Sequence, residues 1–116
     1  MKGFFLSSLL SLFVLISALG LKAAEDYRSE AEFLYEQRTI GSYKKCINLY
    51  LKALETNPND YEANWKCSRA YIGYGEEAKK QNVEGWKDIG VKYGKEAMKF
   101  AQKAIEQEPN KPDGYY

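Results

Sequence analysis

Residues 50–59 read YLKALETNPN, and residues 101–110 read AQKAIEQEPN. The two stretches have Lys-Ala, Glu and Pro-Asn at matching places. In each, apolar residues recur at steps of three and four until a proline, which cannot continue a helix, closes the run. We therefore interpret both stretches as ends of α-helices of one kind, and the chain as one that repeats a helical unit.

Small and medium residues precede each proline at helical spacing. Residues 46–53 place Cys, Tyr and Ala at steps of four and three, and residues 97–104 place three alanines at the same steps. Side chains of this size let two helices approach closely. After the first proline, residues 64–71 read NWKCSRAY, with Asn, Cys-Ser and Tyr again at helical spacing and a turn glycine expected at Gly75.

This arrangement resembles the tetratricopeptide repeat (TPR) family. The family's 34-residue helix-turn-helix unit reads Trp-x2-Leu-Gly-x2-Tyr, then Ala-x3-Phe, then Pro. The resemblance implies an all-α, right-handed α-solenoid with a first unit at residues 25–60 and a second at residues 61–110. The first unit has Gly41 at the expected turn but departs from the aromatic positions of the pattern at Glu30 and Gln37.

The second unit is longer than a family repeat, because Pro58 and Pro109 are separated by more than 34 residues. We place an insertion at residues 76–92. Its apolar residues continue at helical steps into the repeat, which predicts one elongated second helix over residues 83–107 with Asn82 as its cap. The residues that carry this periodicity are Trp86, Ile89, Tyr93, Ala97, Phe100 and Ala104.

Glycines within this predicted helix weaken it, since each costs about 1 kcal/mol relative to alanine. Gly85, Gly90 and Gly94 all fall there. One interpretation is a close helix contact on the face that Gly90 and Gly94 share. The alternative is a break in the helix near Gly90.

The ends of the chain have patterns of their own. Residues 1–24 begin with Lys2, continue with an apolar run at 4–19 and end in small residues, which is typical of a secretory signal peptide. We therefore expect export to the periplasm; the alternative is an inner-membrane anchor formed by residues 4–19. Residues 111–116 align with the start of the second unit, so we expect a third, truncated unit, with further TPR repeats missing from this chain.

Composition argues against several functions. The 17 basic and 16 acidic residues are interleaved rather than clustered, so a nucleic-acid partner is not expected. Histidine is absent. Neither a phosphate-binding glycine loop nor a zinc-ligand pattern occurs, and we expect no enzyme activity, no cofactor and no metal site. For Cys46 and Cys67, buried free thiols are favoured, although export and an even cysteine count leave one disulfide as an open alternative.

The resemblance implies that the first helix of each pair lines a concave groove for a partner. The outward positions in the first unit are Arg28, Ala31, Tyr35 and Arg38, and those in the second are Glu62, Trp65, Arg69 and Ile72. Tyr35 and Trp65 would be flat anchors, and Arg38 and Arg69 would pair with a carboxylate. In the alternative interpretation, Trp65 packs against the long helix of its own unit.

We therefore expect a non-catalytic protein-protein interaction scaffold in the bacterial cell envelope, with a protein or peptide partner and no stable membrane insertion once the leader is removed. The alternative is a periplasmic accessory protein that binds a small solute for a TRAP-type transporter. It rests on a weaker similarity to exported TPR proteins associated with such transporters. Residues 64–71 are also similar to the helical domain of regulator-of-microtubule-dynamics proteins.

Overall fold

A computed structural model describes residue 20 and residues 22–115 of the chain. The predicted leader run at 4–19 lies outside these described residues, while residues 22–24, assigned to the end of the leader, are helical. One helix covers residues 22–37, and we call it the first helix. It is followed by α2 (Ile40–Thr56), α3 (Tyr61–Lys80), α4 (Trp86–Gln107) and the short 3-10 helix η1 (Pro112–Tyr115). The described ranges contain no strand, so the predicted all-α class is confirmed.

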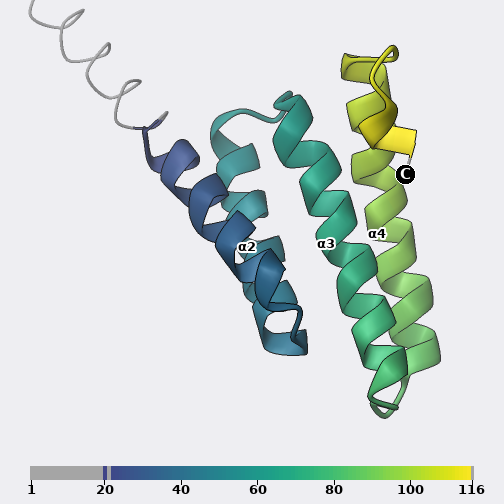
Figure 1. Ribbon diagram of the computed structural model, residues 1–116. Helices are drawn as coiled ribbons and strands as arrows, with labels where there is room; N and C mark the ends of the chain where they lie inside the picture. Colours follow the sequence, from purple (N-terminus) through teal and green to yellow (C-terminus); the bar gives the residue numbers. More distant parts are fainter. Residues whose placement is uncertain (1–19, 21, 116) are drawn as a thin grey trace, which may run out of the picture.

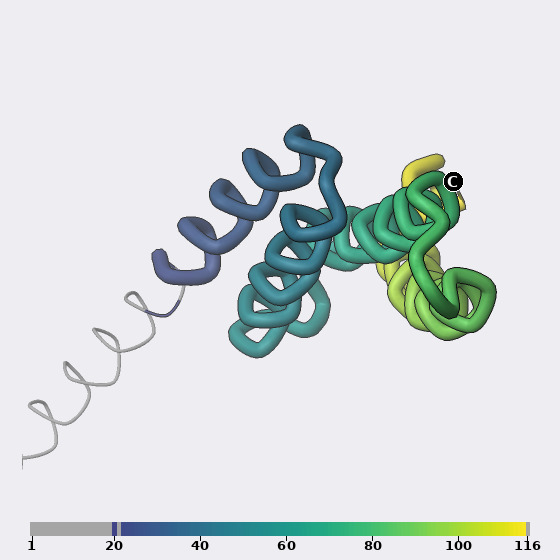
Figure 2. The backbone as a smooth tube through the Cα atoms, turned by 90° about the horizontal axis from the view of Figure 1, so that it is seen from below, coloured from purple at the N-terminus to yellow at the C-terminus, as the bar shows by residue number. Residues whose placement is uncertain are grey.

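The four long helices lie side by side, and consecutive helices run in opposite directions (Figure 1). The first helix and α2 form one hairpin, and α3 and α4 form the other. The view in Figure 2 shows the two hairpins as adjacent pairs, with α3 between α2 and α4. Because α3 packs against both α2 and α4, it is the central helix of the fold.

The first turn is built by a capping box and not by the expected glycine. Arg38 takes a left-handed φ of 55°, and Thr39 caps α2. The Thr39 hydroxyl accepts from the Ser42 backbone N–H at 3.0 Å, and the Ser42 hydroxyl oxygen accepts from the Thr39 N–H at 2.9 Å. Gly41, predicted as the turn residue, therefore lies within the first turn of α2.

The turn between α3 and α4 also differs from the prediction. Helix α4 begins at Trp86, not near residue 83, and its N-cap is Gly85, with a left-handed φ of 76°. Asn82 is not a cap; it lies in the turn with a φ of 52°. Asparagine and glycine tolerate this region better than other residues, which is why the chain reverses here.

Residues 76–92, which we expect to be an insertion, form the last part of α3, the turn and the first part of α4, and not only the start of the second helix as predicted. Helix α3 has 20 residues and α4 has 22. Gly75, expected in a turn, lies inside α3. A Cβ atom built on Gly75 would lie 3.7 Å from the Cα of Gly90 on α4. The helix runs unbroken through Gly90, so the predicted break is wrong. A Cβ atom on Gly90 or Gly94 would meet no atom within 4 Å, so a close helix contact does not explain these two glycines either.

The core lies between the two hairpins and is made of small and medium side chains. Cys46 and Tyr50 from α2 meet Cys67 and Ala70 from α3, and all four are fully buried. Both cysteines are free thiols in the structure. Burial raises the pKa of the Cys46 thiol to about 12 and also raises that of Cys67. Among the described residues, no helix has both the length and the hydropathy needed to cross a membrane.

Candidate functional site

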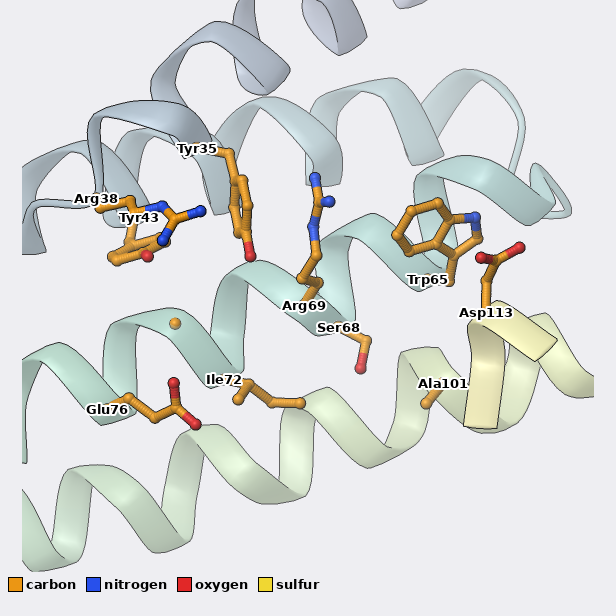
Figure 3. A pocket seen from close by; sticks show the side chains of 11 residues that line it. Tyr35, Arg38, Tyr43, Trp65, Ser68, Arg69, Ile72, Glu76, Ala101 and Asp113 are labelled. Atoms are coloured by element: carbon orange, nitrogen blue, oxygen red, sulfur yellow. The ribbon is translucent and has the colours of Figure 1, made fainter. Parts of the chain in front are cut away.

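A groove runs along α3, and we call it the α3 groove. It encloses about 320 Å³ and is open to solvent. Its walls come from every helix of the described fold, because α3 lies centrally between the hairpins (Figure 3). The lining residues are Tyr35, Arg38, Tyr43, Trp65, Ser68, Arg69, Ile72, Gly73, Glu76, Ala101 and Asp113.

Most of the predicted binding residues meet in this groove. Of the eight outward positions, five line the groove: Tyr35, Arg38, Trp65, Arg69 and Ile72. Arg28 and Glu62 instead line a separate charged hollow. Ala31, expected to face outward, is fully buried.

Arg69 lines the groove and is already paired within its own chain. Its guanidinium carbon lies 3.7 Å from the centre of the Tyr35 ring and 5.1 Å from that of Trp65. Its Nη2 donates to both carboxylate oxygens of Glu32 at 3.2 Å. The side chain is therefore held between two aromatic rings and a carboxylate of its own chain. It shapes the groove wall, whereas Arg38 forms no ion pair with the residues that the structure describes.

Glu32 is the centre of a charged network that the sequence did not indicate. It accepts from Arg69, from the hydroxyl of Tyr50 at 3.1 Å, and forms an ion pair with Lys66 at 3.0 Å. Burial acts to raise the pKa of Glu32, but the hydrogen bonds and charges of Lys66 and Arg69 outweigh it and hold the pKa below its ordinary value. This network joins the first helix to α2 and α3.

Replacing this carboxylate gives a pH-dependent prediction. A carboxyl whose pKa is lower in the folded state stabilises the fold above its unfolded pKa, near 4.5, and loses that contribution as pH falls through the folded pKa. At pH 7, Glu32→Gln should therefore lower the free energy of unfolding by roughly 1 kcal/mol. The gap to wild type should close below pH 4.5. Urea unfolding followed by circular dichroism at several pH values measures it.

The matched control for that experiment is Glu30→Gln, on the same helix, where the side chain is exposed. It should leave the unfolding free energy near wild type at pH 7. A Glu32→Gln deficit that stayed constant down to pH 3 would contradict an ionic role for Glu32.

The end of the groove near Arg38 depends on a glycine. Tyr43 packs edge-on to Tyr35, with ring centres 5.6 Å apart. A Cβ atom on Gly73 would lie 2.5 Å from the Cε1 atom of Tyr43, closer than any two such atoms can approach. Only glycine at position 73 leaves room for the Tyr43 ring in its present place. The Tyr43 ring can therefore form this part of the groove wall.

The opposite end of the groove is closed by η1. The hydroxyl of Tyr61 on α3 donates to the Asp113 carboxylate at 2.8 Å, which ties η1 to the start of α3. Desolvation and this hydrogen bond raise the pKa of Tyr61 to about 12. Sequence reasoning missed six lining residues. Tyr43, Ala101 and Asp113 come from other helices than the two expected to line the groove, while Ser68, Gly73 and Glu76 lie on α3 beside the predicted positions.

The groove combines apolar and charged groups. Three aromatic rings, an aliphatic side chain and separated charges offer contact area and hydrogen-bonding groups. Within the described part of the chain, no cluster of three or more Cys, Asp or Glu residues has the geometry to hold a metal ion. Comparison with protein-family models, with curated proteins and with solved structures found no match to this chain.

Proposed function

We propose that the protein is a non-catalytic interaction scaffold that binds a short segment of a partner protein in the α3 groove. The observation that carries this proposal is the convergence of Tyr35, Trp65 and Ile72 with Arg38 around one open cavity. The proposal includes a right-handed TPR-like solenoid as the framework. It also includes export to the cell envelope, for which the apolar run at 4–19 after Lys2 is the support.

The groove favours a segment with an apolar side chain and a carboxylate. Arg38 and Glu76 lie at one end, and Trp65 and Asp113 lie at the other (Figure 3). An apolar side chain of the partner would cover the exposed part of the Trp65 ring and Ile72. Its carboxylate would pair with Arg38, since Arg69 is already bound to Glu32. Aromatic and arginine side chains commonly contribute most to such interfaces.

Selection of binders from a random peptide library tests the proposal. Peptides selected on the full chain should lose affinity about tenfold to a hundredfold for Trp65→Ala, which corresponds to about 1.4–2.7 kcal/mol. Arg38→Ala should weaken the peptides that contain a carboxylate and spare those that do not. Isothermal titration calorimetry supplies the dissociation constants.

Trp86→Ala is the matched control, because Trp86 stands at the start of α4 and does not line the α3 groove. Circular dichroism verifies that each variant is folded. The proposal fails if the library yields no binder, or if selected peptides bind the Trp65→Ala variant as tightly as wild type.

A small solute is the second candidate for the same groove, as expected of an accessory protein for a TRAP-type transporter. The cavity volume of about 320 Å³ favours it, since pockets for small ligands begin near this size. A panel of small organic acids should then raise the melting temperature of the wild-type protein but not of Arg38→Ala. An unchanged melting temperature across the panel would contradict the small-solute candidate and leave peptide binding as the proposed function.

A further inference from the structure

A second surface of the molecule carries exposed apolar side chains. It is a hollow of about 510 Å³ along α4, lined by α4, by part of α3 and by η1, and we call it the α4 hollow. Val91 is 60% exposed and Met98 is 71% exposed there. Around them lie Ile72, Gly90, Gly94, Ala97, Ala101 and Tyr115. The α4 hollow shares only its α3 edge and Ala101 with the α3 groove.

One end of this surface already has a helical turn packed on it. A Cβ atom on Gly114 of η1 would lie 2.9 Å from the Cγ1 of Ile105 and 3.3 Å from the carbonyl oxygen of Ala101. The backbone of η1 therefore rests directly on α4. From Met98 to Val91 the same face continues without a cover among the described residues.

The charges at the two ends of the fold have opposite signs. Of the lysines on α4, Lys95 lines the hollow and Lys87 lies two turns before Gly94 on the same helical face, while Lys99 is already paired with Glu96. The first helix, at the other edge of the molecule, is mainly acidic on its exposed side: Glu25, Asp26, Glu30 and Glu36 against Lys22. Phe33 projects from this acidic helix and is 68% exposed.

We propose that a second copy of the chain docks its first helix in the α4 hollow, with Phe33 between Val91 and Met98. The acidic side chains beside Phe33 then lie near Lys95 and Lys87, an arrangement that favours association and fixes its orientation. Two α4 hollows packed on each other would instead set Lys95 of one copy against Lys95 of the other. The interface is head-to-tail, so a dimer still presents one free first helix and one free hollow, and the assembly grows further.

Sedimentation of the chain recovered from its producing host tests this, together with two variants that each block one surface. The average mass of wild type should rise with concentration and pass that of a dimer. Phe33→Asp alone and Met98→Asp alone should each sediment as a monomer, with association weakened at least tenfold. Mixed in equal amounts, the two should form a dimer that does not grow, because one retains its hollow and the other its first helix.

Controls separate this surface from the α3 groove and from misfolding. Asn48→Asp adds an acidic side chain to the exposed side of α2 and should associate like wild type. Trp65→Ala, which lies in the α3 groove and lines no part of the α4 hollow, should do the same, so self-association should persist where peptide binding is lost. The proposal is overturned if wild type stays monomeric at all concentrations, if either blocked variant still associates alone, or if their mixture remains monomeric.

Discussion

Tyr50→Ala is expected to lower the free energy of unfolding by about 3–5 kcal/mol, the range for removing a large aromatic side chain from a packed interior. Tyr50 is fully buried on α2, where it meets residues of the first helix and of α3. Because a domain of this size is stabilised by only about 5–15 kcal/mol, such a loss leaves little margin. Urea unfolding followed by circular dichroism measures the change.

Two companion variants divide this effect into its parts. Tyr50→Phe keeps the ring and removes only the hydrogen bond to Glu32, so it should cost about 1.5–3 kcal/mol at most. Tyr115→Ala removes a tyrosine that is 59% exposed and should change stability by less than 1 kcal/mol. If Tyr50→Ala were no more damaging than Tyr115→Ala, Tyr50 would not be part of the core.

Helical periodicity predicted the elements well because it reports which face of each helix is buried. Helix ends were predicted before Pro58 and Pro109 because proline lacks a backbone N–H and cannot continue a helix. Thr56 and Gln107 are indeed the last residues of α2 and α4. Turns were predicted less well. Gly75 was assigned to a turn by analogy with a repeat of ordinary length, whereas the chain reverses at residues with left-handed φ values, Asn82 and Gly85.

The groove residues on α3 were predictable for the same reason, since Trp65, Arg69 and Ile72 recur at helical steps on one face, whereas Tyr35 on the first helix was predicted from the TPR resemblance. What that pattern did not reveal is pairing across helices. Arg69 is neutralised by Glu32, which lies 37 positions earlier in the chain. Such a partner is recognisable only when both helices are placed in space. The sequence pattern therefore did not indicate that the charge of Arg69 is already paired within the chain.

Asn64 illustrates a second kind of side chain whose role needs the fold. It stands at the place of the tryptophan in the TPR pattern. Here it is fully buried, and its Nδ2 donates to the carbonyl oxygens of Pro58 at 3.1 Å and Asp60 at 2.9 Å. The same nitrogen also lies 3.3 Å from Oε1 of Gln107, the last residue of α4. One amide therefore connects the turn between the hairpins to the last residue of α4.

Asn64→Leu is accordingly expected to lower the free energy of unfolding by about 2–3 kcal/mol. Leucine has a similar size, so the loss comes from buried carbonyl groups left without a donor and not from a cavity. The Asp60 carbonyl keeps the Asn64 backbone N–H at 3.0 Å, which limits the cost mainly to Pro58 and Gln107. Asn59→Leu, in the same turn but exposed, is the matched control and should change stability by less than 0.5 kcal/mol. Hydrogen exchange adds a second measurement: in Asn64→Leu the amides at the start of α3 should exchange faster, since the turn before them loses its anchor. Equal stability of Asn64→Leu and wild type would mean that water replaces the amide at this turn and that Asn64 does not hold the hairpins together.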